Sequence, residues 1–401
     1  MGTTNRRDFL KNMALGGTAA GVASAFKPRR IYGESGPQFK RIVYRELGST
    51  GVKVSEIGFG SMNTREGDLI NAAIDSGINY VDTAHYYMNG ANEEMVGKVL
   101  KNKRDKVFLT TKVGLNNKEP DSMRKEIALS LKRLQTDHVD LLLLHKSNAR
   151  EEILNDDIMN VFDEARKKGQ TRFIGFSTHN FDAEVFDAAV DSKFWEALLT
   201  GYNAFSPPGV TESIKKVREA GIAVIGMKNL ITMTSPPSTR VPLKDIRKDG
   251  ASATTPQQSL LKWVLDDQYV DTTIPGITTF EHLEDDLAVM GTKMTFDDER
   301  IINRYCEGVK SLYCRGVSGC SGCRDKCPKG VDINEINRCL GYAYGYGDLA
   351  LAQENYDSLP DSNRLDVCSD CDTCAVKCIN GIDLTNNIRK AKALFGGIAP
   401  V

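Results

Sequence analysis

The sequence predicts an α/β chain in which a (β/α)8 TIM barrel precedes a small, mainly helical domain. Short apolar segments alternate with helix-like segments from residue 42 to residue 295, and eight such units in about 250 residues are typical of this barrel. All ten cysteines lie between Cys306 and Cys378, so the composition changes near residue 300. A doubly wound open sheet is the alternative, but it would favour a G-x-G-x-x-G turn after an early strand, which the sequence lacks.

The expected strands and helices of the barrel are identified by their residue patterns and by the residues at their ends. The strands are short apolar runs, whereas several helices begin at a capping Asp, Ser or Thr and end at a glycine, as at Gly169 and Gly221. We expect strands at residues 56–59, 79–82, 107–112, 139–145, 172–176, 197–200, 223–226 and 271–274. We expect helices at residues 121–134, 157–168, 182–191, 211–220, 255–266 and 280–290.

The first 35 residues are expected to be a signal and linker that lie outside the fold. The segment from Asn5 to Lys11, with Arg6 and Arg7 at its centre, precedes a weakly apolar Gly/Ala stretch at residues 13–26. This arrangement resembles a twin-arginine signal, and it predicts export to the periplasm by a pathway that carries folded proteins. A disordered basic tail is the alternative.

Charge and hydropathy argue against two classes of protein. The chain has 52 basic and 53 acidic residues, and no basic stripe favours a nucleic-acid partner. No apolar run approaches the roughly 20 residues of a membrane-spanning helix. The chain is therefore expected to have no transmembrane segment.

Four polar residues are expected at one rim of the barrel. Asp82, Lys112 and His145 end the second, third and fourth strands, and Tyr87 lies in the loop after the second. Catalytic groups of such barrels sit at the carboxyl ends of the strands. A lysine or histidine that closes an apolar strand would be costly without a partner, and convergence at the rim provides one. The alternative is that the four residues have only local roles at strand ends.

The chain carries several short motifs around these four residues. They are YRELGSTG at 44–51, IGFG at 57–60, Asp82-Thr83-Ala84 with Tyr87, Lys112, His145, and GFS at 175–177. Over roughly residues 42–295 the chain thereby resembles the aldo-keto reductase family. The resemblance implies that Tyr87 is the general acid that protonates a carbonyl oxygen as hydride reaches the carbon. It also implies that Lys112 stabilises the phenolate, that Asp82 holds Lys112, and that His145 orients the carbonyl.

The resemblance also implies a nicotinamide cofactor, NAD(P)H, whose usual contacts are only partly present. Ser177 fits a contact to the nicotinamide amide, and Asn180, Thr200 and Lys228 are further cofactor-binding candidates. Where many members place Lys, Ser and Arg for the 2′-phosphate of NADPH, this chain has Gly276, Ile277 and His282, with Asp285 and Asp286 nearby. A doubly charged phosphate is poorly bound without such cations.

The cysteines predict a 4Fe–4S ferredoxin-type domain at residues 313–384, between a connecting helix at 296–312 and a C-terminal tail at 385–401. The second of two cysteine runs has the C-x2-C-x2-C-x3-C spacing of iron–sulfur ligands, and the fourth cysteine of each run ligates the other cluster in two-cluster ferredoxins. One expected set is Cys327, Cys368, Cys371 and Cys374; the other is Cys320, Cys323 and Cys378 with Cys314, because the regular position holds Val317. One cluster, a zinc site or disulfides remain alternatives, although zinc needs only four ligands.

We therefore expect an exported iron–sulfur oxidoreductase that interconverts a carbonyl and an alcohol. Its partners would be a small-molecule carbonyl or alcohol substrate and a redox partner protein. Nicotinamide moves two electrons and a cluster moves one, so coupling them needs a flavin or a partner. Two alternatives stay open. One is an electron-transfer or ligand-binding protein with a non-catalytic barrel. The other is a purely structural role for the clusters, which would pin the C-terminal domain over the barrel mouth.

Overall fold

The computed structural model describes residues 42–179, 181–230, 254–318, 320–323, 325–368, 371 and 373–395. The expected export signal at residues 1–35 and the candidate Asn180 lie outside the described residues. Among the helices that the structure does describe, none is long and apolar enough to cross a membrane.

Eight parallel strands follow one another in chain order, as expected from the alternating pattern. Isolated bridges pair Ile57 with Thr273 and Gly60 with Gly276, and they join the first of these strands to the last. The Gly58 amide donates to the Thr273 carbonyl at 2.7 Å across this join. The strands are β3 (Phe59–Gly60), β4 (Tyr80–Asp82), β5 (Phe108–Val113), β6 (Val139–Leu144), β7 (Thr171–Thr178), β8 (Ala197–Gly201), β9 (Ala223–Met227) and β10 (Thr272–Thr273).

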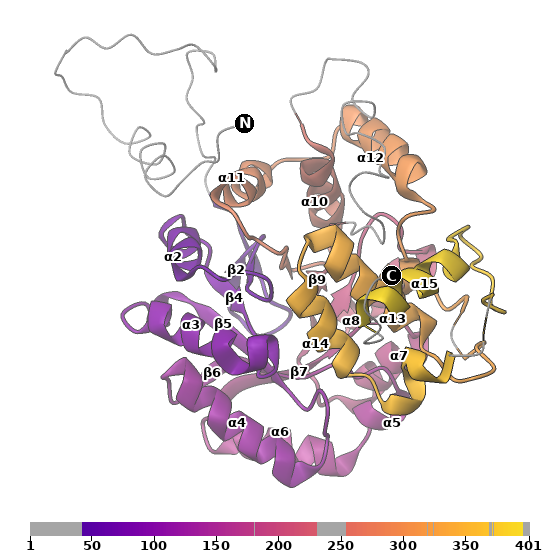
Figure 1. Ribbon diagram of the computed structural model, residues 1–401. Helices are drawn as coiled ribbons and strands as arrows, with labels where there is room; N and C mark the ends of the chain where they lie inside the picture. The colour runs from indigo at the N-terminus through magenta and orange to yellow at the C-terminus, as the bar shows by residue number, and fades with distance from the viewer. Residues whose placement is uncertain are drawn as a thin grey trace.

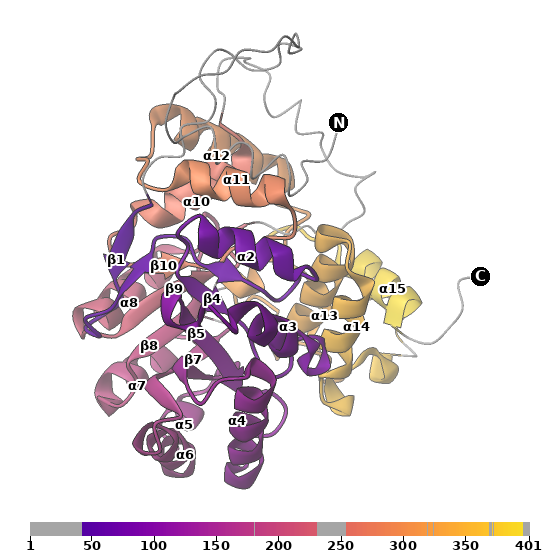
Figure 2. The same ribbon diagram turned by 90° about the vertical axis from the view of Figure 1, so that its left-hand side faces the viewer.

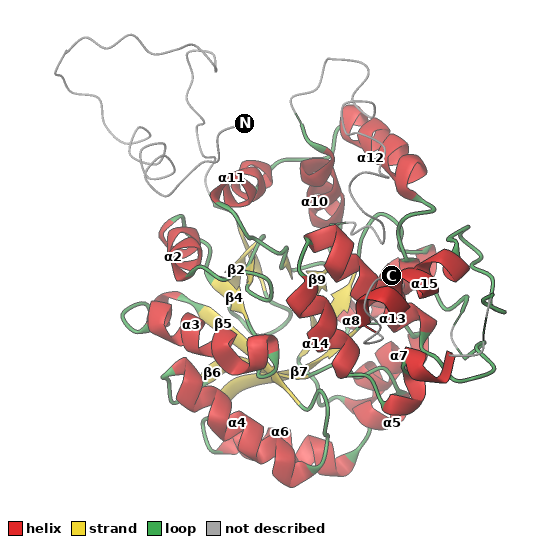
Figure 3. Ribbon diagram, in the orientation of Figure 1, coloured by secondary structure: helices red, strands yellow, loops and turns green. Residues whose placement is uncertain are grey.

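Amphipathic helices surround the strands (Figure 3). Their ends follow local rules: Thr255 forms a capping box with Gln258, and Asn155, Asp182 and Thr279 cap other helices with their side chains. The helices are α2 (Gly67–Asp75), α3 (Ala91–Leu100), α4 (Pro120–Leu134), α5 (Arg150–Ile153), α6 (Asp156–Lys167), α7 (Ala183–Ser192), α8 (Pro208–Glu219), α10 (Pro256–Asp266) and α11 (Phe280–Val289). Short 3-10 turns η1 (Tyr87–Gly90) and η2 (Arg104–Lys106) lie between them.

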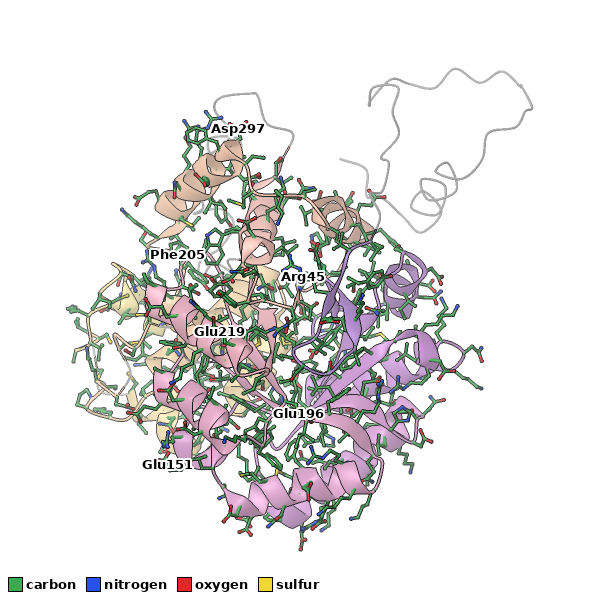
Figure 4. The ribbon with its side chains drawn as sticks, turned by 180° about the vertical axis from the view of Figure 1, so that it is seen from behind. Arg45, Glu151, Glu196, Phe205, Glu219 and Asp297 are labelled. Atoms are coloured by element: carbon green, nitrogen blue, oxygen red, sulfur yellow. The ribbon has the colours of Figure 1, made fainter. Side chains whose placement is uncertain are left out.

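A two-stranded antiparallel hairpin, β1 (Tyr44–Glu46) and β2 (Lys53–Ser55), precedes the barrel. The sequence prediction missed it because each strand has only three residues. Leu47 and Val54 of this segment join the apolar cluster inside the barrel. Its turn needs a glycine at Gly48, where φ is +55° and a Cβ would lie 2.5 Å from the Ala223 nitrogen. Figure 4 shows Arg45 and Glu196 at the end of the barrel that lies away from the C-terminal helices.

The C-terminal region is mainly helical and lies against the other end of the barrel (Figures 1 and 2). Its buried apolar side chains form a cluster of their own, separate from the barrel core. The stretch expected as a C-terminal tail contains a helix, because Ile388, Ala391 and Phe395 are buried in that cluster. The elements are α12 (Phe296–Val309), η4 (Arg315–Ser318), α13 (Ile333–Leu340), the π-helix η5 (Gly341–Tyr346), α14 (Leu349–Asp357), η6 (Asp361–Asn363), η7 (Leu365–Cys368) and α15 (Leu384–Phe395).

Candidate active site

A pocket of about 670 Å³ lies at the carboxyl ends of the barrel strands. One wall is the barrel rim, which contributes Asp82, Tyr87 and His145. The opposite wall comes from the C-terminal helices and includes Arg338 and Tyr342. The volume is in the usual range for small-molecule sites, and the wall groups converge on one space.

The structure places the four predicted rim residues together. Lys112, in β5, donates from Nζ to Asp82 Oδ2 at 2.6 Å, to the Thr83 carbonyl at 2.8 Å and to the Tyr87 hydroxyl at 3.2 Å. The Nζ also lies 4.8 Å from the centre of the Tyr87 ring. Asp82 ends β4, and the 3-10 turn that follows brings Tyr87 back over Lys112. The ammonium therefore links the carboxylate to the phenol.

Burial and charge set the protonation of this group. Burial raises the pKa of Tyr87 well above its usual value, and the nearby Asp82 carboxylate raises it further. Burial lowers the pKa of Lys112, whereas the Asp82 carboxylate opposes that effect. Tyr87 is therefore a protonated phenol at neutral pH, which is the form that can donate a proton.

His145 follows β6 directly and faces Tyr87. The two rings meet edge to face with their centres 6.0 Å apart. Burial lowers the pKa of His145 well below its usual value, and Lys112 and Lys146 lower it further, so the imidazole is neutral. In the described part of the chain its Nδ1 atom is buried without a hydrogen-bond partner. A neutral imidazole at this position can orient a bound oxygen without adding charge.

The predicted cofactor residues lie at different depths. Lys228, just after β9, lines the pocket. Ser177 and Thr200 are buried in β7 and β8 and do not line it. The Ser177 hydroxyl instead accepts from the Lys146 amide at 2.9 Å. A nicotinamide contact by Ser177, Thr200 or Asn180 stays a prediction.

The other end of the pocket is acidic. His282, Asp285 and Asp286 line it together with Gly276. Burial raises the pKa of Asp286 well above its usual value, and Asp285 adds to that effect. Asp285 Oδ1 accepts from Gln258 Nε2 at 3.0 Å. Of the residues that replace the expected phosphate-binding cations, Gly276 and His282 therefore face the pocket, whereas Ile277 is buried in the core.

The sequence prediction missed the C-terminal wall. The Tyr342 hydroxyl accepts from Lys228 Nζ and from an Arg338 guanidinium nitrogen, both at 2.8 Å. Arg338 also binds Glu335, which accepts from Lys146 Nζ at 2.6 Å and so ties α13 to the barrel. Burial would raise the pKa of Tyr342, but the Arg338 and Lys228 cations lower it below its usual value. Nothing in the Tyr-, Ala- and Gly-rich sequence of this segment indicated that it lies over the barrel.

The cysteines fall into two neighbourhoods. Cys314, Cys320, Cys323 and Cys378 line one small cavity, with Asn334 and Asn337 of α13 beside them. This is the second predicted set, in which Cys314 replaces the regular position. Cys320 Sγ accepts from the Gly322 amide and from Asn380 Nδ2, both at 3.4 Å.

The cysteines of the first predicted set lie around Cys368. Burial raises the pKa of the Cys368 thiol, and nearby Cys371 and Cys327 raise it further. Cys327, Cys368 and Cys374 pack against the apolar cluster of the C-terminal helices. Over the described ranges, no three or more His, Cys, Asp or Glu side chains are arranged to hold a metal ion, and all ten cysteines are free thiols.

Comparison with known proteins bears on the barrel. Residues 56–234 match the aldo/keto reductase family. An uncharacterized oxidoreductase, YqkF of Bacillus subtilis, is 33% identical over 151 residues, which span 33% of this chain and 48% of that protein. Methylglyoxal reductase DkgB of Escherichia coli O157:H7 is 28% identical over 258 residues, or 62% of this chain and 92% of the enzyme.

Solved structures share the fold. The holo form of aldo-keto reductase AKR11C1 from Bacillus halodurans superposes with a TM-score of 0.56 at 26% identity, covering 66% of this chain and 96% of that one. An aldo/keto reductase from Klebsiella pneumoniae in complex with NADP and acetate has a TM-score of 0.55 at 24% identity, covering 66% and 95%. The family match at residues 56–234 lies within the barrel.

Proposed function

We propose that the protein interconverts a carbonyl and an alcohol in the pocket at the barrel rim, because residues 56–234 match the aldo/keto reductase family and the similar proteins are oxidoreductases. The observation that carries this proposal is the linked group of Asp82, Lys112 and Tyr87 with the neutral His145 beside it. These groups provide a proton donor, a cation that stabilises the donor after transfer, and an orienting imidazole.

The chain's own residues would handle the proton and the carbonyl oxygen. The Tyr87 hydroxyl donates to the oxygen, and the Lys112 ammonium at 3.2 Å stabilises the phenolate that remains. Asp82 keeps Lys112 charged and in place through the 2.6 Å contact. His145 donates a hydrogen bond to the same oxygen and holds it near Tyr87. A bound nicotinamide would supply the hydride.

We expect NADH to bind at least as tightly as NADPH. Lys228 lines the pocket and is the candidate contact for the cofactor on the barrel side. The Asp285 carboxylate at this end of the pocket would repel a 2′-phosphate. Positions 276, 277 and 282 provide no Arg or Lys, and a phosphate needs such cations for tight binding. Fluorescence titration of the purified protein with each nucleotide measures the preference; tighter binding of NADPH would contradict it.

We also propose that the cysteine-rich region holds two 4Fe–4S clusters. Cys314, Cys320, Cys323 and Cys378 would hold one, and their shared cavity and the amide donors to Cys320 suit a thiolate-bound cluster. The first predicted set, Cys327, Cys368, Cys371 and Cys374, has the regular spacing and would hold the other cluster. The four thiolates of each set would hold the cluster through separate irons and would not share one metal ion.

The export of this protein by the twin-arginine route remains part of the proposal. A pathway that carries folded proteins would deliver clusters already assembled. Lysine at both Arg6 and Arg7 should leave the protein in the cytoplasm of a host that has this pathway, as measured by cell fractionation. Equal amounts of the double variant and the wild type in the periplasm would contradict the signal.

One observation favours the second candidate, an electron-transfer protein whose barrel does not react. Helix α13 faces both sites: Asn334 and Asn337 line the cysteine cavity, whereas Arg338 lines the barrel pocket. A helix is about 10 Å across, so a cluster in that cavity would lie close to whatever the pocket binds. Under this candidate a ligand in the pocket would change the cluster's potential without being converted.

The test of the proposed function is Tyr87→Phe in the intact chain. Loss of a general acid should lower nicotinamide-dependent carbonyl turnover by about 10²- to 10⁴-fold while the visible absorbance of the clusters persists. Tyr86→Phe is the matched control, because Tyr86 also lines the pocket but donates to the Glu354 carbonyl. Unchanged turnover in Tyr87→Phe would show that Tyr87 is not the acid.

Iron, sulfide and bound-nucleotide analysis after anaerobic purification tests the cofactors. Two clusters predict about eight iron and eight sulfide per chain. About four of each would contradict the two-cluster proposal, and zinc in their place would contradict iron–sulfur binding altogether.

A further inference from the structure

Two tyrosines face the pocket from opposite walls. Tyr87 belongs to the barrel rim, and Tyr342 belongs to the π-helix η5 of the C-terminal region, which Figure 2 shows beside the barrel. Each hydroxyl accepts a hydrogen bond from a lysine, Lys112 for Tyr87 and Lys228 for Tyr342. The proposed carbonyl chemistry uses only the first pair.

The charge around Tyr87 favours the protonated phenol. Its cation, Lys112, is already paired with the Asp82 carboxylate at 2.6 Å, so the two charges largely cancel. The Lys112–Tyr87 contact of 3.2 Å is also long for a bond to a full phenolate.

The charge around Tyr342 favours the phenolate. Two cationic donors, Lys228 and Arg338, lie at 2.8 Å from its oxygen, and both also lie within 5.4 Å of its ring centre. Glu335 balances part of the Arg338 charge but shares its carboxylate with Lys146. Two charge-assisted bonds to one oxygen stabilise its negative form.

The other groups that face Tyr342 do not reverse this preference. The Tyr346 ring lies 5.5 Å away, and Tyr87 lies across the pocket; both are buried phenols whose pKa is raised. The buried His179, which also lines the pocket, has a pKa well below its usual value because of burial and the Arg338 and Lys228 cations. These three groups are therefore neutral near pH 7.

We propose that Tyr342 is a base and Tyr87 an acid in a second reaction of this pocket, the enolisation of a carbonyl compound. When the surroundings of two titratable groups make one hold its proton more tightly than the other, the first can act as an acid and the second as a base. The inference rests on the proposed function, because it needs the same bound carbonyl, but it needs no nicotinamide. The substrate class is an α-hydroxy or other enolisable ketone or aldehyde.

The step balances within the pocket. The C–H bond on the carbon next to the carbonyl breaks, and its proton goes to the Tyr342 oxygen. The bonding pair forms the C=C bond of the enol, and the carbonyl oxygen takes the Tyr87 proton. The proton on the Tyr342 oxygen exchanges with water, and the reverse reaction then returns a solvent proton to the carbon. Nothing is oxidised or reduced.

The experiment follows hydroxyacetone in D2O by proton NMR with the intact wild-type chain and no nicotinamide. The α-proton signal should disappear faster than in buffer alone. Tyr342→Phe should slow this enzymatic exchange about 100-fold or more. Tyr346→Phe is the matched control, because Tyr346 lies on the same π-helix and its pKa is raised by burial, and it should keep the exchange.

A second readout does not depend on turnover. The near-ultraviolet difference spectrum of wild type minus Tyr342→Phe at pH 7 should contain tyrosinate absorbance, and Lys228→Met should reduce it. Absence of enzymatic exchange in a wild type that still reduces carbonyls would overturn this inference alone. Exchange that survives in Tyr342→Phe would also overturn it. Exchange without any nicotinamide-dependent reduction would instead remove the proposed function and leave the enolisation in place.

Discussion

The barrel rim and the C-terminal helices both present a tyrosine to the same pocket, but they surround it with different charge. At the rim, Lys112 is neutralised by Asp82, and the Tyr87 phenol stays protonated. On the opposite wall, Lys228 and Arg338 converge on Tyr342 and lower its pKa. One side chain type therefore has two opposite proton affinities within one cavity.

The proton affinity of each tyrosine therefore depends more on the partner of its neighbouring cation than on the presence of that cation. Both tyrosines have a lysine within hydrogen-bond distance. Among the residues that the structure describes, only Lys112 of these two lysines has a buried carboxylate in contact. Substitutions that change these partners should therefore affect the two walls differently.

Lys112→Met should cause the largest loss of stability. It leaves the Asp82 carboxylate buried without its cation, and breaking a buried ion pair costs about 3–5 kcal/mol of unfolding free energy. Urea unfolding at pH 7 measures the change. The double variant Lys112→Met with Asp82→Asn removes the stranded charge, so it should recover part of the loss; a single variant as stable as the wild type would contradict this account of the rim.

Glu335→Gln should weaken the opposite wall by about 2 kcal/mol, because it removes a charged acceptor shared by Arg338 and Lys146. The loss is smaller than at the rim since the Lys146 side chain is 18% exposed and can be solvated. Urea unfolding again measures it. A loss of unfolding free energy equal to that of Lys112→Met would contradict this, because the ion pairs of the two walls would then contribute equally to stability.

The same carboxylate predicts a pH dependence. Burial would raise the pKa of Glu335, but Arg338 and Lys146 lower it far below its usual value. A depressed folded pKa stabilises the protein above the unfolded pKa, about 4.3 for Glu, and this stability is lost as the pH falls below that value. Unfolding free energy between pH 3 and pH 5 should therefore rise more steeply in the wild type than in Glu335→Gln; parallel slopes would contradict this.

Lys216→Met should have the smallest effect. Its contact with Asp187, at 2.7 Å, lies between side chains that are 54% and 43% exposed. Exposed pairs contribute little, so the unfolding free energy should stay within about 0.5 kcal/mol of the wild type. A change above 2 kcal/mol would show that surface pairs contribute as much as the pocket pairs.

The two walls also differ in how far the sequence predicts them. Asp82, Lys112 and His145 follow apolar runs whose periodicity identifies parallel strands, and carboxyl ends of such strands meet at one rim. Eight parallel strands were expected and are found, with bounds that shift by a few residues, as where β5 continues to Val113 beyond Lys112.

The opposite wall depends on tertiary placement that no local pattern encodes. Arg338 and Tyr342 lie on a helix whose position over the barrel is fixed by Glu335 and Lys146, 189 residues apart in sequence. Ser177 illustrates the same limit in the barrel itself. Its motif suggested a cofactor contact, but its depth in β7 follows from packing that the motif does not specify.

The most direct test of hydride chemistry in this pocket is an isotope measurement. The intact protein would reduce a small ketone, such as hydroxyacetone, with nicotinamide carrying deuterium at both C4 positions. We predict that the alcohol carbon of the product carries one deuterium, because the hydride passes directly to the carbonyl carbon beside Tyr87. Product with only solvent hydrogen at that carbon would contradict the account, since the electrons would then have reached the substrate singly by another route.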